Sequence, residues 1–228
     1  MNYVNCNKED LEKEYAALVA EYEEVKGKGL KLNMARGKPG EDQLNLSRPL
    51  LDVINSSTDC ITAHGADCRN YGELAGIDEC KNFFAEIFDV DPSDVMVGGN
   101  SSLNMMFDTI AGFMTKPVVE GCKPWYEVKN RKFLCPAPGY DRHFAITEYF
   151  DFDLIPVPMT ENGPDMDVVE KLVENDDSIK GIWCVPKYSN PLGITFSDET
   201  VKRFAALKPA AKDFRIMWDN AYCVHDVT

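Results

Sequence analysis

From residue 94 to residue 218 the sequence alternates short apolar segments with amphipathic ones, and this alternation restricts the chain to few folds. Apolar runs typical of buried strands lie at 95–97, 132–135, 153–157, 181–185 and 214–218. Segments with helical spacing lie at 101–114, 141–150, 166–175 and 197–207, and one more, at 77–88, precedes the alternating region. Strands and helices that alternate in this way predict a mostly parallel sheet with helices on both faces. We therefore expect an α/β fold, a three-layer α/β/α sandwich.

The N-terminal part of the chain has a different pattern. Residues 8–26 carry apolar side chains at helical spacing between acids and lysines, and Gly27 follows as a helix stop. Residues 30–47 show no regular period, and residues 48–58 are expected to be helical. A helical arm is thus predicted to precede the sheet.

One domain boundary is expected, near residue 46. Residues 1–45 would form an N-terminal helix and arm, and residues 46–228 would form the sheet domain. A chain of 228 residues is long enough to bury a core of this size.

The charge of the chain argues against two classes of partner. The formal net charge is −14 and the sequence pI is about 4.6. Nucleic acids and anionic membrane surfaces attract basic proteins, so neither is an expected partner. No apolar run is long enough to span a bilayer, and Lys8, Glu9 and Asp10 stand where a signal peptide would be apolar.

The eight cysteines show no paired spacing of the kind that binds zinc. Disulfide scaffolds are typical of much shorter secreted chains, so we expect reduced thiols and a cytoplasmic protein. Cys135 and Cys184 fall in apolar runs, where a thiol usually serves as a small apolar side chain.

The first motif that carries chemistry is a glycine turn. Gly98, Gly99, Asn100 and Ser101 connect a predicted strand to a predicted helix. Amide groups at a helix start, together with hydroxyl groups, suit a phosphate dianion. The alternative is that the glycines only make the turn and that Asn100 or Ser101 caps the helix.

The second motif follows the strand at 132–135. Tyr140 comes directly after a Pro-Gly turn, which would present its ring for stacking on a flat ligand, and His143 lies one helical turn further. Tyr140 could instead cover the sheet edge, and for His143 we favour the simpler interpretation of a surface histidine.

The third motif places Asn190 in a turn between two prolines. Pro191 restricts the backbone of Asn190, so its carboxamide would act as a directed hydrogen-bond donor. An ordinary Asx-type turn is the alternative, because asparagine is common before proline.

The fourth motif is Asp219 with Tyr222, at the end of the last predicted strand. A carboxylate buried there needs a cationic partner, and a bound protonated heterocycle is a candidate. A phosphate cradle, a stacking phenol, an amide donor and an acid at the ends of successive strands together describe a pocket for pyridoxal 5′-phosphate.

Four short strings of the sequence resemble a known family. The strings that begin at Arg36 (RGKPG), Tyr71 (YGELAG), Gly98 (GGNSSL) and Trp218 (WDNAY) resemble class I, fold-type I pyridoxal-phosphate aminotransferases. They are most similar to the aspartate aminotransferase subgroup related to the aminotransferase-like half of MocR proteins. The resemblance covers the chain from about residue 30 onward and implies that 46–228 is a cofactor-binding large domain, incomplete at its C-terminus. Residues 1–45 would belong to the small domain.

The resemblance also implies roles for individual residues. Asp219 would pair with the pyridine nitrogen of the cofactor, which keeps the ring able to accept an electron pair. The other implied contacts are Asn190 and Tyr222 to the ring 3-oxygen, Tyr140 stacked on the ring, and Gly99, Asn100 and Ser101 to the phosphate. Tyr71 would reach the phosphate of a neighbouring subunit, which implies a homodimer. Gly37 or Lys38 would lie near the substrate carboxylate.

One expected element of the family is missing from these residues. The family's Schiff-base lysine follows the Asp-x-x-Tyr motif by roughly three dozen residues, whereas the last lysine here is Lys212. We therefore expect the 228 residues to be the N-terminal part of an aminotransferase, and to be inactive alone.

The sequence leaves several functions open. The main expectation is amino-group transfer between an amino acid, with aspartate as the donor the resemblance implies, and a 2-oxo acid. A pyridoxal-phosphate lyase or decarboxylase would use the same cofactor contacts. A non-catalytic cofactor-sensing or assembly module of the same fold is an alternative of another class, and a nucleotide-binding domain built on the Gly98-Gly99 turn is a third.

Overall fold

The computed structural model describes residues 3–32 and 37–226, and the chain divides into two compact units, residues 1–60 and 61–228. The expected domain boundary near residue 46 stays a prediction.

The first unit consists of helices. Its elements are a 3₁₀ turn at Tyr3–Asn5, helix α1 at Lys8–Gly27, helix α2 at Glu41–Ser47 and a 3₁₀ segment at Arg48–Asp52. Helix α1 confirms the predicted helix, and Asn7 caps it by accepting a hydrogen bond of 2.9 Å from the Asp10 amide.

The prediction of a helix at 48–58 is wrong. Helix α2 lies upstream, in a stretch where the sequence shows no regular period, and only a short 3₁₀ segment follows it. The Gln43 side chain accepts a hydrogen bond of 2.8 Å from the Gly40 amide, and Glu41 and Asp42 occupy the first turn. Acids favour a helix start, and a proline inside a helix removes a hydrogen bond, which accounts for the change at Pro49.

The second unit is a parallel α/β structure. Its strands are β1 (Lys132–Ala137), β2 (Asp153–Thr160), β3 (Gly163–Pro164), β4 (Ile179–Cys184) and β5 (Arg215–Trp218). Its helices are α3 (Asp78–Phe88), α4 (Ser102–Thr115), α5 (Asp141–Tyr149), α6 (Met166–Asn175) and α7 (Asp198–Ala205), with 3₁₀ turns at Pro92–Asp94 and Trp125–Glu127.

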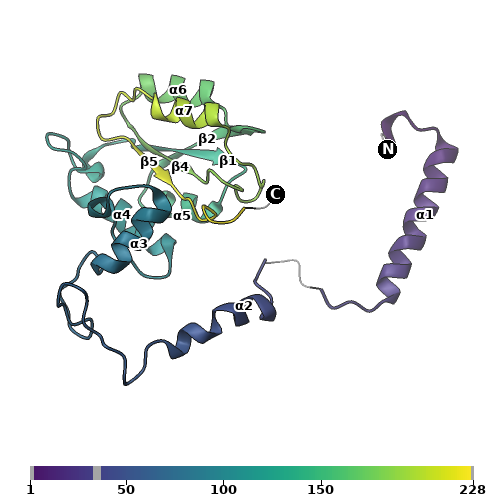
Figure 1. The fold of residues 1–228 in the computed structure, drawn as a ribbon. Helices are drawn as coiled ribbons and strands as arrows, with labels where there is room; N and C mark the ends of the chain where they lie inside the picture. Colours follow the sequence, from purple (N-terminus) through teal and green to yellow (C-terminus); the bar gives the residue numbers. More distant parts are fainter. Residues whose placement is uncertain (1–2, 33–36, 227–228) are drawn as a thin grey trace. The chain divides into compact units, whose positions relative to one another are not determined.

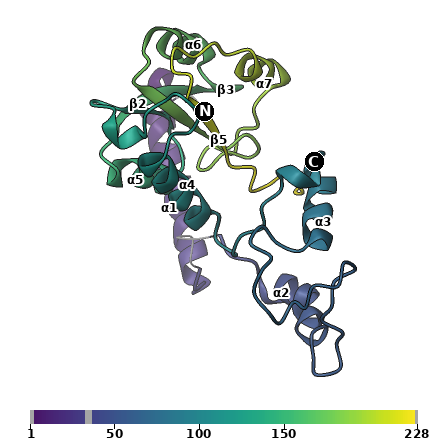
Figure 2. The same cartoon turned by 90° about the vertical axis from the view of Figure 1, so that its left-hand side faces the viewer.

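The strands form one sheet in the order β3-β2-β1-β4-β5. The pairs β1–β2, β1–β4 and β4–β5 are parallel, and only the short β3 pairs antiparallel, with β2. Helices α6 and α7 cover one face of the sheet and α4 and α5 the other (Figure 1), an arrangement also visible after a quarter turn (Figure 2). The predicted three-layer α/β/α architecture is confirmed.

Two apolar cores fill the spaces between the layers. Leu134, Ile182 and Phe204 belong to the core under α6 and α7, whereas Phe133 and Trp183 belong to the core under α4 and α5. Successive residues of one strand therefore point into different cores. This is the pattern of a parallel sheet buried on both faces.

One predicted strand is absent. Residues 95–97 form no strand, although the Val97 amide donates a hydrogen bond of 2.9 Å to the Ala75 carbonyl. A strand needs a neighbour that completes its ladder of hydrogen bonds, and among the described residues no strand lies beside this segment.

Candidate active site

The carboxyl ends of β1 and β4 mark the place where the chain reverses its direction across the sheet. From β1 the chain passes through α5 to β2 on one side, and from β4 it passes through α7 to β5 on the other. Ligands of open α/β sheets bind beside the carboxyl ends of strands at such a reversal. The segments that leave β1, β4 and β5 carry Tyr140, Asn190 and Asp219.

These three side chains line one pocket with a volume of about 330 Å³. Pockets for small molecules usually measure roughly 300–1,000 Å³. The complete lining is Asn100, Ser101, Ser102, Leu103, Tyr140, Val185, Asn190, Asp219, Ala221 and Tyr222. The structure thus brings together residues from all four predicted motifs.

Asp219 is held at both its backbone and its side chain. Its amide donates a hydrogen bond of 2.8 Å to the Cys184 carbonyl, which extends the β4–β5 ladder by one residue. Its carboxylate is 12% exposed, and Oδ2 lies 3.0 Å from Nε2 of His143. An ionised carboxylate only accepts hydrogen bonds, so Nε2 of His143 donates.

The favoured interpretation of His143 as a surface histidine is wrong. The side chain is 1% exposed, and its ring stacks on Trp183 with centroids 4.8 Å apart and an interplanar angle of 18°. The sequence feature that could have indicated a buried His143 is its position three residues after Tyr140, one turn into α5. Asp219 therefore has a partner in its own chain.

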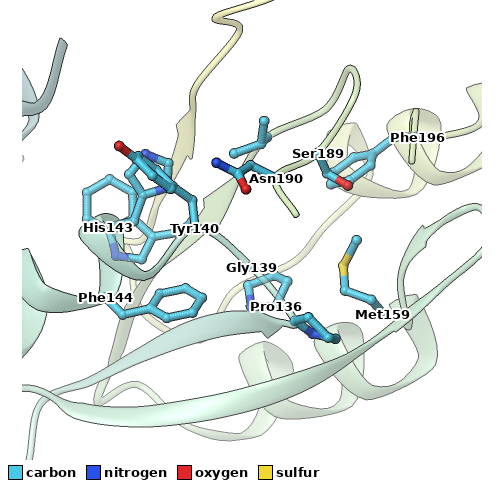
Figure 3. Close-up of a pocket in the computed structure, with 12 residues that line it drawn as sticks. Pro136, Gly139, Tyr140, His143, Phe144, Met159, Ser189, Asn190 and Phe196 are labelled. Atoms are coloured by element: carbon cyan, nitrogen blue, oxygen red, sulfur yellow. The ribbon is translucent and has the colours of Figure 1, made fainter. Parts of the chain in front are cut away.

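Tyr140 stands beside this pair. Its ring meets His143 edge to face, with centroids 5.0 Å apart. Figure 3 shows Tyr140 and His143 on one side of a smaller neighbouring cavity of about 20 Å³, with Asn190 in a separate loop that also lines it. Tyr140, Val185 and Asn190 line both cavities, so the two spaces adjoin at these residues.

The N-terminus of helix α4 lines another part of the pocket. Ser101 is the N-cap residue, yet its side chain makes no capping hydrogen bond, and the first turn contains no acid. Backbone N–H groups and the positive end of the helix dipole are therefore directed at the pocket, an arrangement suited to an anion. A Cβ added to Gly99 would meet no atom within 4 Å, so packing does not require this glycine.

The turn after β5 carries Tyr222, which is half-buried, with its ring 6.4 Å from that of Tyr188. Lys187 Nζ ties this turn to the β4 loop through hydrogen bonds of 2.6 Å to Asp226 Oδ1 and 3.3 Å to the Cys223 carbonyl. The hydrogen bond with Asp226 raises the pKa of Lys187.

Three predicted site residues are not among the lining residues of this pocket. Tyr71 is 97% exposed and lines a separate cavity of about 440 Å³. Gly37 and Lys38 belong to the first unit and are exposed, and Arg36 of the same string lies outside the described residues.

The pocket also has lining residues that the sequence analysis did not select. Ala221 lies between Asp219 and Tyr222, Val185 ends the β4 run, and Ser102 and Leu103 begin α4. The sequence feature that could have identified these residues is that each lies next to one of the four motifs.

Two thiols near this edge of the sheet are unsuited to reaction. Burial raises the pKa of Cys135 to about 12, and raises the pKa of Cys184 as well. No group of three His, Cys, Asp or Glu side chains that could hold a metal occurs among the residues that the structure describes.

A family model described as aspartate amino-transferase matches residues 6–228. The chain belongs to this family. Over 229 residues it is 45% identical to a putative aminotransferase of Mycolicibacterium smegmatis, an alignment that covers all of this chain and 54% of that protein. It is 46% identical over 207 residues to an aspartate aminotransferase of Corynebacterium glutamicum, covering 91% of this chain and 48% of the other.

Solved structures of aminotransferases agree with this assignment. An aspartate transaminase from Corynebacterium glutamicum superposes with a TM-score of 0.87 at 42% identity, over 98% of this chain and 52% of the other. A putative aminotransferase from Corynebacterium diphtheriae superposes with a TM-score of 0.82 at 46% identity, over 90% and 50%. The chain therefore spans about half the length of the relatives it matches.

No helix among the described residues has the length and apolar character required to cross a membrane.

Proposed function

We propose that the pocket binds pyridoxal 5′-phosphate, and that the chain serves amino-group transfer between an amino acid and a 2-oxo acid. The observation that carries this proposal is the carboxylate of Asp219, which faces the pocket at the end of β5 with His143 behind it. Aspartate as the donor is supported by the family match and by the relative from Corynebacterium glutamicum.

The residues present fit this cofactor in charge and shape. Asp219 would face the ring nitrogen, Tyr140 and Ala221 would contact the ring, and the start of α4 would hold the phosphate through Asn100 and Ser101, with Gly99 leaving room. Asn190 and Tyr222 would hydrogen-bond the ring 3-oxygen. The cofactor itself supplies the electron sink for breaking bonds at the substrate Cα.

His143 and Asp219 have a shared task in this scheme. The imidazole donates to Oδ2 and so keeps the carboxylate oriented, while the apolar surroundings of Trp183 keep water away from the ring. An oriented carboxylate at this position favours a protonated ring nitrogen over a neutral one, because opposite charges stabilise each other strongly at a partly buried site.

We further propose a homodimer with shared sites. Tyr71 and Leu74 of one short segment are 97% and 94% exposed, and large side chains exposed together suit contact with a second subunit. Residues 1–45, with Gly37 and Lys38 near the substrate carboxylate, would belong to a small domain, and the eight free cysteines suit a cytoplasmic protein.

These residues are proposed to hold the cofactor without a covalent link and to be inactive alone. Lys187, near the turn of Tyr222, is occupied by Asp226 and the Cys223 carbonyl. Its raised pKa keeps the amine protonated and therefore a poor nucleophile.

The test is binding of pyridoxamine 5′-phosphate, which has no aldehyde and so cannot react with surface lysines. We expect saturable binding to the 228-residue chain, and Asp219→Asn should weaken it roughly tenfold, because a hydrogen bond to a charged group is lost. Asp226→Asn, an acid outside the pocket, is the matched control. Binding that is absent, or equal in Asp219→Asn and the unchanged chain, would refute the proposal.

A further inference from the structure

Trp183 packs directly on the ring of His143. The two rings are stacked at 4.8 Å, and both residues are almost completely buried, at 2% for Trp183 and 1% for the His143 side chain. Among the described residues, Asp219 is the one hydrogen-bond partner of the His143 ring. A single hydrogen bond fixes one atom of a ring but leaves its plane free to tilt, so the plane is set by packing.

Trp183 is itself fixed to the helix that carries His143. Its Nε1 donates a hydrogen bond of 3.2 Å to Oγ1 of Thr147, and that hydroxyl donates one of 3.1 Å to the Phe144 carbonyl. Residues 143 and 147 lie one turn apart on the same face of α5. The indole therefore spans both positions, with its face on His143 and its N–H on Thr147.

The position of Trp183 in the sheet makes this contact rigid. It belongs to β4, the strand whose loop carries Asn190, and its neighbour Cys184 accepts the hydrogen bond from the Asp219 backbone. The support of His143 and the backbone of Asp219 thus come from adjacent residues of one strand. A change in the indole would move the imidazole relative to the Asp219 backbone, which the Cys184 carbonyl holds independently.

Building on the proposed function, we infer that Trp183 is a positioning residue for the ring nitrogen of the cofactor, acting through His143 and Asp219. It does not touch the pocket itself, because the pocket lining does not include it. Trp183 determines the orientation of the imidazole, the imidazole determines the orientation of the Asp219 carboxylate, and the carboxylate selects a ring that carries a nitrogen.

The experiment compares two ligands, pyridoxamine 5′-phosphate and its 1-deaza analogue, in which carbon replaces the ring nitrogen. Trp183→Leu removes the aromatic face, Trp183→Phe keeps a face but loses the N–H, and Thr147→Val removes the acceptor alone. We expect Trp183→Leu to weaken pyridoxamine phosphate about tenfold, and Trp183→Phe and Thr147→Val about threefold. The deaza analogue should bind all variants and the unchanged chain equally.

The matched control is Trp125→Phe. Trp125 is a buried tryptophan of the same core, and its Nε1 donates to Asp213 rather than to α5. It should lower stability at least as much as Trp183→Phe does, because its lost hydrogen bond is to a charged group, while leaving the ratio of the two affinities unchanged. If Trp183→Leu does not fold, Trp183→Phe and Thr147→Val decide the question.

A second readout needs no cofactor. The imidazole ¹⁵N signals of His143, assigned with His143→Gln, report whether Nε2 donates to a carboxylate. The signal should persist in Trp125→Phe and change in the Trp183 variants. Equal losses for both ligands, or unchanged His143 signals in the Trp183 variants, would overturn the inference. Failure of the unchanged chain to bind pyridoxamine phosphate would instead refute the proposed function, while the His143 signals would still decide the positioning role of Trp183.

Discussion

Nε2 of His143 lies 3.0 Å from Oδ2 of Asp219, and the two residues reach this contact from α5 and from the end of β5, 76 positions apart in the sequence. The pair joins the two sides of the point at which the chain reverses across the sheet. It supplies the Asp219 carboxylate, which lines the pocket, with a hydrogen-bond donor from the same chain.

Replacement of His143 by leucine should therefore affect both stability and binding. The Asp219 carboxylate would lose its donor in a partly buried place, and the free energy of unfolding should fall by about 1–3 kcal/mol. Pyridoxamine phosphate should also bind more weakly. The control is His64→Leu, because His64 forms a comparable pair with Asp78 at 3.2 Å with its side chain 72% exposed. Urea unfolding that shows equal losses for both variants would contradict the assigned role.

A second pair, Lys180 with Asp213, is buried, and removal of one partner alone should be strongly destabilising. Lys180 Nζ lies 2.8 Å from Asp213 Oδ1, with both side chains at most 7% exposed, and Trp125 donates to the other oxygen. Asp213→Ala would leave Lys180 buried and unpaired and should lower the free energy of unfolding by about 3–5 kcal/mol. Asp226→Ala breaks the more exposed pair with Lys187 and should change the free energy of unfolding far less, because solvent screens this pair. Similar urea midpoints for the two variants would show that the buried pair is unimportant.

Asp176 should make the stability depend on pH in acid. Hydrogen bonds from Lys132 and then Ser178 lower its pKa from 3.8 to about 2. A depressed folded-state pKa contributes stability above the unfolded-state value, and this contribution disappears as the pH falls through about 2. Both partners of the ion pair are about 30% exposed, so the effect should be of order 1 kcal/mol.

The measurement for Asp176 is urea unfolding at several pH values. Asp176→Asn should be less stable than the unchanged chain at pH 5, and the difference should shrink towards pH 2. A difference that stays constant over this interval would assign the effect to packing.

Gly139 should be required by the turn that presents Tyr140. A Cβ at this position would collide with the Pro136 carbonyl and would lie 2.8 Å from the Phe144 ring. Gly139→Ala should destabilise the domain by about 1–3 kcal/mol through overpacking and displace Tyr140. Gly112→Ala is the contrasting variant, because its Cβ meets no atom within 4 Å in α4, and it should stabilise by up to about 1 kcal/mol. Thermal unfolding separates the two, and a tolerated Gly139→Ala would disprove the steric argument.

Treatment of the 228-residue chain with pyridoxal phosphate and then borohydride should leave no stoichiometric, single-site pyridoxyl-lysine. Lys187 is engaged by Asp226, and its amine stays protonated. Peptide mass analysis checks this expectation. Asp226→Ala provides the sensitised control, since it frees Lys187. A specific adduct in the unchanged chain would contradict the view that these residues hold the cofactor without a covalent link.

Local features of the sequence determined most of the elements. Helix α6 has the predicted bounds, Met166–Asn175, because Asp165 accepts hydrogen bonds from the Asp167 and Val168 amides at its start. The strands β1, β2, β4 and β5 lie where apolar runs predicted them, and Asp219 follows the last of these. Side-chain spacing, caps and apolar runs are properties of neighbouring residues, so they can be recognised in the sequence without knowledge of the fold.

Only the tertiary structure decided the features that depend on distant partners. Residues 95–97 have the composition of a strand, but the described part of the chain places no strand beside them, and ladder hydrogen bonds must come from such a neighbour. His143 is buried because β4 places Trp183 against it and β5 brings Asp219 to its edge. The sequence by itself determined which residues could do chemistry at the strand ends. Packing across the sheet determined which of them meet, because a contact between residues 76 positions apart follows from strand order and not from local spacing.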